Sequence, residues 1–488
     1  MDEALYQKKL EEIFVRFPSV QSTGFGDAYK PGLAHMEAFD GLLGQPSRSY
    51  RTLHVAGTNG KGSVANMLAS ALAATGLKVG LYTSPHILDF RERMRILDAG
   101  SDGPARLIGK EAVWDFLCRW EKTFDELELS FFEITTGMAF RWFADEKVDV
   151  AVIEVGLGGR LDSTNIITPE VAVITSIGLD HCAMLGDTRA AIAGEKAGIF
   201  KPGVPAVVGT RDAETAPVFE QRAASLGCPL LFADSFYSGA SCCGGQRDCS
   251  AFSSASAKCS AIPLPPSTSA PDNCTTTNTA PSTSAPDNCQ ASGLIAGLAG
   301  RMDLQGEWQE ENLRTVLTVL SVIGVEAGTE VRDAIAHTAR RMDFHGRWEI
   351  IGRSPDMLCD IGHNPPALKR NFAQLEQYVS EGRYDRLIFV YGVMADKDLD
   401  GILPLMPRGA AFVAVAPDTA RAMKATALYE RLRAALPGPV LLGGSVAEGL
   451  GKALGLAAAA EPLKPLIYIG GSTFVVSEAV AALNTNTL

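Results

Sequence analysis

Lys61 stands in a stretch whose residue types and spacing suit the binding of a phosphate group. The stretch reads HVAGTNGKGSVANML and places three glycines around this one lysine. Glycines let backbone N–H groups point at an anion, a helix N-terminus favours negative charge, and a lysine adds a full positive charge. The spelling departs from G-x-x-x-x-G-K-[ST], because Gly57 precedes Gly60 by three residues and Gly62 separates Lys61 from Ser63. The stretch predicts a nucleotide phosphate loop, with a glycine-rich turn carrying a solvated lysine as the alternative.

Such a loop needs a strand before it and a helix after it, and the flanking residues predict both. Thr52 to Ala56 is an apolar run, and Val64, Met67 and Leu68 begin a helical spacing that continues to Gly76. Short apolar runs that alternate with helical periods favour βαβ units on a parallel sheet. Further runs of this kind are Val79–Thr83, Val148–Val155, Val171–Ile177 and Val204–Val208.

The alternation of strand-like and helix-like segments restarts after Phe344, which predicts a second, smaller α/β domain. We expect an α/β chain with a large domain over residues 1–343 and a C-terminal domain over 344–488. The later apolar runs are Trp348–Ile351, Met357–Ile361, Leu387–Val390, Phe412–Ala416, Val440–Leu442 and Leu466–Ile469.

A low-complexity insertion is expected in the first domain at about residues 235–292. It is rich in Ser, Thr, Pro, Ala and Asn, repeats PSTSAPDNC, and holds six of the chain's 10 cysteines. Such a composition does not build a core, so we interpret it as a flexible insertion. The alternative is a metal-binding or redox-sensitive loop, although no CxxC pair occurs there.

Composition limits the classes of partner. The 488 residues have a formal net charge of -12, which gives no basic field for nucleic acid or an anionic membrane. The start, MDEA, is acidic where a signal peptide is positive, and no apolar run approaches the roughly 18 residues of a membrane span. We therefore expect a cytoplasmic protein that acts on small molecules, without nucleic-acid or membrane partners.

Six motifs in a fixed order resemble one family. These are GTNGKGS, LYTSPHILDFRERMRI, EVGLGGRLDSTN, SIGLDHCAMLGDT, EKAGIFKPG and DIGHNPPA. Together they resemble the folylpolyglutamate synthase and dihydrofolate synthase branch of the Mur ligase superfamily, over nearly the whole chain except the insertion. The resemblance implies a P-loop-type ATP-binding domain with a parallel central sheet, a smaller Rossmann-like C-terminal domain, and a monomer.

The resemblance also implies a set of site residues. The ATP loop matches Thr58, Asn59, Gly60, Lys61, Gly62 and Ser63, and the first Mg²⁺ matches Ser84, Glu154 and His181. The metal-side residues end or follow apparent strands, which is where open α/β sheets bind ligands. Taken singly, they could instead be an N-cap serine, an ion-paired carboxylate and a hydrogen-bonded histidine.

Lys196 matches a lysine that Mur-type ligases can carbamylate with CO₂, which turns a cation into an anion able to support a second Mg²⁺. The alternative is an unmodified lysine near phosphate or paired with Glu195. Lys61, His181 and Lys196 are the expected catalytic residues.

The rest of the ATP site is expected at the second domain. The resemblance assigns it to Asn312, Arg347, Asp360 and His363. Trp308 stands where the family commonly has histidine, and His345 where it more often has proline. His363 could instead stabilise the turn before two prolines.

The pterin site is expected at Phe132, Glu133, Leu161, Asp162 and Ser163, with TGFGDAYKPGLAHM, residues 23–36, as a second contact. An aromatic ring from Phe131 or Phe132 could stack on a flat heterocycle, or both rings could belong to the core. The resemblance gives Ser472 and Thr473 as candidates for binding glutamate.

Joining a carboxylate to an amine in water is uphill, so ATP must first convert the carboxylate to an acyl phosphate that the amine attacks. We expect an ATP- and Mg²⁺-dependent ligase that adds L-glutamate to dihydropteroate and also extends reduced folates at the γ-carboxyl. The alternatives are a Mur ligase that acts on a UDP-sugar or another carboxylate acceptor, and a nucleotide-binding scaffold without catalysis.

Overall fold

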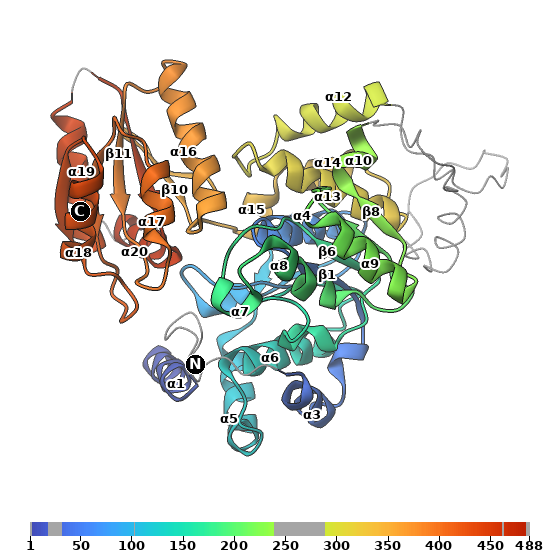
Figure 1. The fold of residues 1–488 in the computed structure, drawn as a ribbon. Helices are drawn as coiled ribbons and strands as arrows, with labels where there is room; N and C mark the ends of the chain where they lie inside the picture. Colours follow the sequence, from blue (N-terminus) through green and yellow to red (C-terminus); the bar gives the residue numbers. More distant parts are fainter. Residues whose placement is uncertain (1, 18–31, 102, 239–287, 461–462, 485–488) are drawn as a thin grey trace.

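Two β-sheets organise the chain, and the computed structural model describes residues 2–17, 32–101, 103–238, 288–460 and 463–484 (Figure 1). The first sheet has eight strands in the order β4-β3-β2-β5-β1-β6-β7-β8. Its centre is parallel, whereas β3 pairs antiparallel with both β2 and β4 at one edge. The bounds are Arg51–Ala56 (β1), Val79–Tyr82 (β2), Met94–Leu97 (β3), Arg106–Leu107 (β4), Val150–Glu154 (β5), Val171–Ile174 (β6), Ala206–Val208 (β7) and Leu230–Phe232 (β8).

The second sheet has six strands in the order β13-β12-β11-β14-β10-β9, and only β9 runs antiparallel to its neighbour among these strands. In Figure 1 this sheet and its helices form a separate lobe beside the first. The bounds are Glu349–Gly352 (β9), Asp356–Asp360 (β10), Arg386–Tyr391 (β11), Ala411–Val415 (β12), Val440–Gly444 (β13) and Pro465–Gly470 (β14).

Helices cover both sheets. Around the first sheet they are Glu3–Arg16 (α1), Ala34–Leu42 (α3), Lys61–Ala73 (α4), Lys110–Glu126 (α5), Phe131–Asp145 (α6), Cys182–Leu185 (α7), Arg189–Lys196 (α8), Ala216–Leu226 (α9), Ala233–Ser238 (α10), Asn288–Ala299 (α12), Gln309–Val322 (α13), Thr329–Ala336 (α14) and Thr338–Met342 (α15). Around the second they are Pro365–Ser380 (α16), Leu399–Ile402 (α17), Ala425–Ala435 (α18), Val446–Ala458 (α19) and Thr473–Asn484 (α20). Short 3-10 turns occur at Pro46–Arg48, Phe90–Arg93, Ser163–Ile166, Ala197–Ile199 and Leu403–Leu405.

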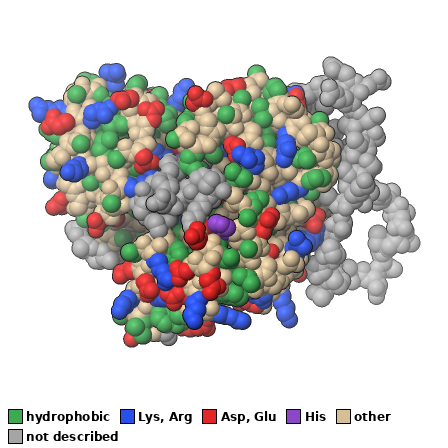
Figure 2. All heavy atoms as spheres, turned by 60° about the horizontal axis from the view of Figure 1, so that its bottom comes forward, with side chains coloured by type: hydrophobic (Ala, Val, Ile, Leu, Met, Phe, Trp, Pro, Cys, Tyr) green, Lys and Arg blue, Asp and Glu red, His purple; other side chains and the backbone are tan. Residues whose placement is uncertain are grey.

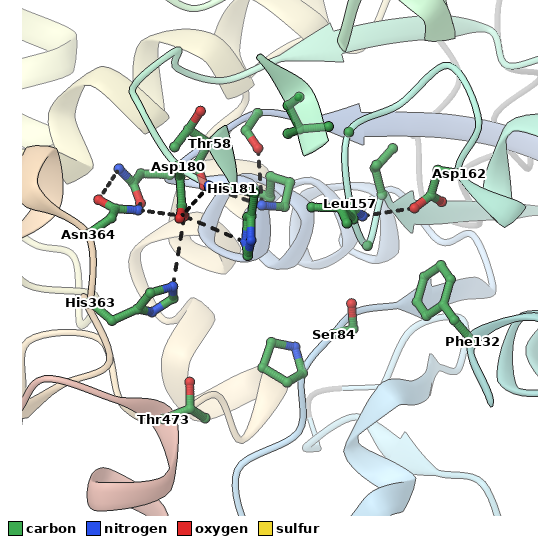
Figure 3. Close-up of a pocket in the computed structure, with 18 of the residues that line it drawn as sticks. Thr58, Ser84, Phe132, Leu157, Asp162, Asp180, His181, His363, Asn364 and Thr473 are labelled. Atoms are coloured by element: carbon green, nitrogen blue, oxygen red, sulfur yellow. Dashed lines mark hydrogen bonds and ion pairs between the residues drawn. The ribbon is translucent and has the colours of Figure 1, made fainter. Parts of the chain in front are cut away.

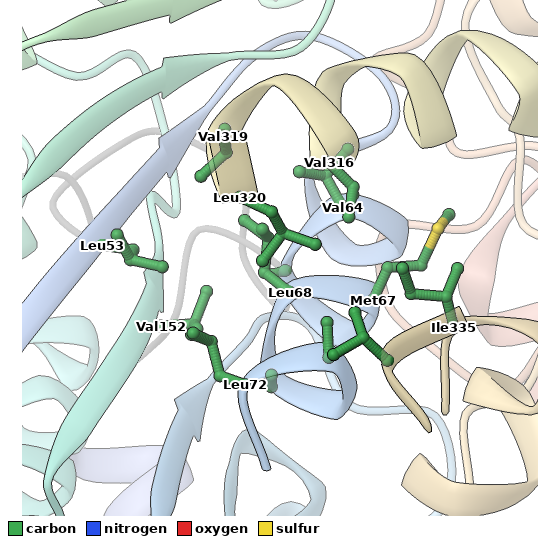
Figure 4. Packing of buried hydrophobic residues seen from close by; sticks show 14 of the residues in the cluster. Leu53, Val64, Met67, Leu68, Leu72, Val152, Val316, Val319, Leu320 and Ile335 are labelled. Atoms are coloured by element: carbon green, nitrogen blue, oxygen red, sulfur yellow. The ribbon is translucent and has the colours of Figure 1, made fainter. Parts of the chain in front are cut away.

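Helix α4, which follows the glycine loop, lies at the centre of the first domain. Every residue from Gly62 to Ala73 is buried, because the helix packs on β5 on one side and on α13 and α14 on the other. Figure 4 shows Leu68 and Leu72 near Val152 of the sheet, with Leu320 of α13 close to them. This enclosure fixes the start of α4 relative to the ends of the strands.

The predicted two-sheet α/β architecture is confirmed, including every strand expected from an apolar run. Three short strands, β3, β4 and β8, were not predicted; all lie at or near the edges of the first sheet. The expected insertion at about 235–292 falls mostly outside the described residues, although α10 and α12 extend into its two ends. The predicted substrate loop at 23–36 also lies mainly outside them.

Charged side chains are interspersed on the face drawn in Figure 2. Between α1 and α5, for example, Lys9 and Arg16 both pair with Glu121, at 2.9 Å in each case. Among the residues that the structure describes, no helix is long and apolar enough to cross a membrane.

Candidate active site

A cleft of about 290 Å³ lies where the carboxyl ends of strands from both sheets meet (Figure 3). From the first sheet it is lined by residues that follow β1, β2, β5 and β6; from the second, by residues that follow β10, β11 and β14. Open α/β sheets bind ligands at these strand ends. Of the predicted site residues, those lining the cleft are Thr58, Asn59, Lys61, Ser84, Phe131, Phe132, Leu161, Asp162, Ser163, His181, Lys196, His363, Ser472 and Thr473.

The glycine loop is held in shape by the segment after β6. Thr175 Oγ1 and Ser176 Oγ donate hydrogen bonds to the Asn59 carbonyl at 2.6 and 2.9 Å. Gly57 and Gly60 have φ angles of 152° and 87°, and a Cβ on either would collide with Thr175 or Asn312. Glycine is therefore required at both positions for the loop to lie against its supports.

Lys61 is the first residue of α4, where the helix dipole and unpaired N–H groups favour an anion. Its ammonium donates to the carbonyls of Gly57 at 3.1 Å and Thr58 at 3.3 Å and lines the cleft. Ser63, one turn into the same helix, is buried and lies 3.4 Å from the Gln309 amide. The start of α4 thus combines the components of a phosphate site.

Ser84 follows β2, Glu154 ends the adjacent strand β5, and His181 follows β6, which β1 separates from β5. Ser84 and Glu154 are in direct contact. Glu154 is buried at the end of β5, and its Oε2 accepts the Ser84 N–H at 3.2 Å. Burial raises the pKa of the Glu154 carboxyl, although Lys61 opposes the shift. His181 adopts a left-handed conformation at φ 52°, and burial lowers its pKa to about 4, so its imidazole is neutral at pH 7.

This donor set fits a divalent cation in part. A serine hydroxyl, a carboxylate and a neutral imidazole are all metal-ligating groups. Within the described ranges, no group of three or more His, Cys, Asp and Glu side chains forms a metal site by itself. Mg²⁺ usually keeps several waters and binds substrate phosphates, so few protein ligands are needed beside a phosphate loop.

Lys196, at the end of α8, is buried, and its Nζ donates to the Gly57 carbonyl at 2.9 Å. Burial, assisted by the charge of Lys61, lowers the pKa of its ammonium from 10.5 to about 7. A large fraction of this side chain is therefore a neutral amine near pH 7, which is the form that reacts with CO₂.

The opposite wall of the cleft is formed by residues expected to bind a pterin. Figure 3 shows the Phe132 ring facing the segment that carries Leu157 and Asp162. Asp162 is buried and accepts N–H groups from Leu157 at 2.8 Å and Thr164 at 3.0 Å, and burial raises the pKa of its carboxyl. Phe131 is 2% exposed and packs on Phe14, so the two adjacent aromatic rings differ in environment.

Glu133 does not line the cleft. Its Oε2 accepts the Ser130 N–H and hydroxyl at 2.7 Å each, which forms the capping box at the start of α6. The prediction that Glu133 contacts a pterin receives no support from this geometry.

Two of the four residues expected at the nucleotide's other end, Asn312 and Arg347, lie near the start of α4, whereas His363 lines the cleft. Asn312 is buried on α13 beside Gly60, and the Arg347 guanidinium lies beside Gly62. Asp360 differs from them, because its carboxylate accepts N–H groups from Trp348, Gly362 and Asn371 at 2.7 to 3.0 Å. Two of these bonds hold the backbone before β9 and after β10, and the third holds the Asn371 side chain of α16. The predicted contact between Asp360 and ATP remains a prediction.

Asp180 was not identified from the sequence, although it directly precedes His181 in the motif SIGLDHCAMLGDT. Its carboxylate accepts hydrogen bonds from Lys397 Nζ at 3.1 Å and Asn364 Nδ2 at 3.0 Å, both from the second domain. The rings of His181 and His363 each lie 3.8 Å from Asp180 Oδ2 (Figure 3).

Burial raises the pKa of the Asp180 carboxyl, but attraction to His363, His181 and Lys397 in their protonated forms outweighs burial. The pKa is therefore held well below its usual range. The pKa of His363, like that of His181, is lowered to about 4, mainly by burial. At neutral pH, Lys397 is therefore the charged partner of Asp180. The side-chain amides of Asn364 and Asn59, in the glycine loop, also donate a hydrogen bond to each other, at 3.1 and 3.2 Å.

A strand–glycine loop–helix turn with a lysine, facing a second α/β domain across a shared cleft, is an arrangement typical of the Mur ligase class. Two family models match: the Mur ligase middle domain over residues 121–242 and the Mur ligase glutamate ligase domain over 346–469. The chain is 33% identical over 362 residues to the folylpolyglutamate synthase of Lacticaseibacillus casei, covering 73% of this chain and 74% of that one. It belongs to the folylpolyglutamate synthase/dihydrofolate synthase family.

Two further similarities extend over more of the chain. A probable bifunctional folylpolyglutamate synthase/dihydropteroate synthase of Haloferax volcanii is 32% identical over 92% of this chain, which spans about half (48%) of that relative's length. A solved bifunctional folylpolyglutamate synthase/dihydrofolate synthase with Mn, AMPPNP and L-glutamate bound has a TM-score of 0.69 at 26% identity, covering 93% of this chain and 95% of that one.

Proposed function

We propose that this protein is an ATP-dependent ligase that forms an amide between L-glutamate and the carboxylate of a pterin substrate. The observation that carries the proposal is the cleft, which joins a phosphate site at Lys61 to an aromatic wall at Phe132 and to polar groups of the second domain. We further propose that residues 1–343 bind ATP and the pterin and that residues 344–488 present glutamate.

The reaction proceeds in two steps. The substrate carboxylate attacks the γ-phosphorus of ATP, which forms an acyl phosphate and releases ADP; the glutamate amine then attacks the acyl carbon, loses a proton and expels phosphate. Lys61 and the N–H groups at the start of α4 balance the charge of the transferred phosphoryl group. Closure of the two domains excludes water, which would otherwise hydrolyse the acyl phosphate.

Ser84, Glu154 and His181 would hold Mg²⁺ beside the phosphates. The ion supplies charge neutralisation between the triphosphate and the incoming carboxylate. The positive charge of Lys61 helps to lower the pKa of the Lys196 ammonium, so the two cations repel each other. Carbamylation of Lys196 would replace one of these cations with an anion able to support a second Mg²⁺. Asn312 and Arg347 would contact the nucleotide from the side of α4, with His363 across the cleft.

Phe132, Leu161, Asp162 and Ser163 would form the pterin site, with Ser472 and Thr473 near the glutamate. We propose that both activities reside in the chain: addition of the first glutamate to dihydropteroate, and γ-extension of reduced folates. We also propose a cytoplasmic monomer.

Phosphate release from the purified full chain tests the proposal. ATP, Mg²⁺ and L-glutamate are supplied with dihydropteroate, tetrahydrofolate or no acceptor, and the products are identified by mass. Turnover with both acceptors is expected; turnover with only one would restrict the chain to a single activity. Turnover with a UDP-sugar acceptor instead, or none with any pterin, would overturn the folate assignment.

A further inference from the structure

The chain passes from the first domain to the second through residues 343–348, between the end of α15 and the start of β9. Asp343 and Trp348, at the two ends of this crossing, have positive φ angles of 47° and 53°. Non-glycine residues persist in this region only where their surroundings hold them. Contacts made within the crossing therefore hold its backbone path.

His345 makes the central contacts. Its Nδ1 lies 2.8 Å from Glu349 Oε1 and its Nε2 lies 3.0 Å from Asp343 Oδ1. Glu349 also accepts the Gly346 N–H through Oε2 at 2.8 Å. Both ring nitrogens face carboxylate acceptors, so the imidazole must carry two protons to satisfy them. The Glu349 hydrogen bond, with added attraction from Asp343, raises the pKa of His345 to about 9.

Arg347 lies two residues further along the same crossing and is directed back at the first domain. Its guanidinium lies 5.0 Å from the centre of the Phe344 ring, and its Nη1 donates to the Gly346 carbonyl at 3.3 Å. A Cβ on Gly62 of α4 would lie 3.5 Å from Arg347 Nη2. The placement of Arg347 beside the phosphate site therefore depends on the backbone path on both sides of Gly346.

We propose that His345 is a positioning residue, whose bridge between Asp343 and Glu349 fixes the crossing and holds Arg347 beside the start of α4. The ligand that Arg347 would bind there is a nucleotide polyphosphate, so this inference rests on the proposed function for the role of Arg347. His345 stands where the family more often has proline, so two charge-assisted hydrogen bonds take the place of a rigid ring in the backbone.

Binding of AMPPNP with Mg²⁺ to the full chain, measured by calorimetry, tests the inference. His345→Gln and Asp343→Asn should each weaken binding about three- to tenfold, the range expected when one partly solvent-exposed hydrogen bond is removed. The double variant should lose little more than either single variant, because all three disrupt the same bridge. In the ligase assay, KM for ATP should rise while kcat changes less than KM.

His337→Gln is the matched control. His337 forms a similar pair with Asp333 on α14, at 3.4 Å and with a comparable exposed fraction, but away from the crossing. Wild-type AMPPNP affinity in His345→Gln and Asp343→Asn, or equal losses in His337→Gln, would overturn the inference. A wild-type chain that binds AMPPNP but ligates no glutamate would overturn the proposed function alone, and one that does not bind AMPPNP would overturn both.

Discussion

Lys61 is placed to act on the phosphates, because its ammonium lies on the glycine loop at the start of a buried helix. Lys61→Ala should lower kcat/KM for ATP by about 100-fold or more, in the range for loss of a preorganised charge in a water-poor site. Phosphate release under saturating glutamate measures the effect. Lys78→Ala, which removes a lysine paired with Glu146 at the far end of β2, should leave kcat/KM close to wild type.

Lys196 gives a pH-dependent stability with a defined sign. Its ammonium has a pKa of about 7 in the folded chain and 10.5 as the ordinary value, so the unfolded chain binds more protons between these limits. The cost of burying Lys196 is greatest below pH 7 and falls as the pH rises towards 10.5. Lys196→Met removes this cost. Its melting temperature relative to wild type should therefore be higher at pH 6.5 than at pH 9.

Thermal scans at the two pH values measure this difference in unmodified protein prepared without bicarbonate. The hydrogen bond to Gly57 weakens as Lys196 loses its proton, but this change is already contained in the pKa of about 7, so the sign of the comparison stands. A difference that is independent of pH would contradict a depressed pKa for Lys196.

At the scale of elements, the turn from β1 into α4 depends on Gly60. Its φ is 87°, and a Cβ would collide with the Asn312 amide oxygen. Gly44 has nearly the same φ, 85°, but open space around it. Gly44→Ala should cost about 1 kcal/mol of stability from backbone strain alone. Gly60→Ala should lower the melting temperature further and abolish AMPPNP binding, since the loop must leave Asn312; equal effects of the two changes would contradict this.

Elements were predictable where burial on both faces makes a strand a nearly continuous apolar run, as in β5, β6, β11 and β14. Two of the missed strands, β3 and β4, lack that signal, whereas β8 is apolar but only three residues long. Strand β3 carries Arg95 within an edge pair, and β4 has only two residues, Arg106 and Leu107. Antiparallel edge strands of this length are specified by their neighbours rather than by their own composition.

The cleft was predictable on its first-domain side, where Lys61, Ser84 and Lys196 each stand in a local motif. On the second-domain side His363, Ser472 and Thr473 were also predicted, but the contacts between the two domains were not. Asp180 and Lys397 are 217 positions apart, and their contact depends on how two separately folded sheets dock. Glu133 shows the converse, because its motif matched a substrate segment while its carboxylate caps its own helix.

At the scale of the whole molecule, Asp180 joins the domains through Lys397 and Asn364. Asp180→Asn would leave the Lys397 ammonium, whose side chain is only 13% exposed, without its carboxylate. Loss of a partly buried charge partner costs on the order of 1–3 kcal/mol, and here that cost falls on the docked arrangement of the domains. The docked state should become less populated, with a larger radius of gyration in X-ray scattering and a slower ligase reaction.

Glu311→Gln provides the comparison within the same domain boundary. Glu311 on α13 pairs with Arg370 on α16 at 2.7 Å, but both side chains are about half exposed. Solvent screening limits such a pair to roughly 0–1 kcal/mol, so this change should leave scattering and activity near wild type. The contrast separates a buried interdomain contact from an exposed one. Identical scattering and rates for Asp180→Asn and wild type would show that Asp180 does not hold the domains together, and that other contacts, such as the hydrogen bonds between Asn59 and Asn364, suffice.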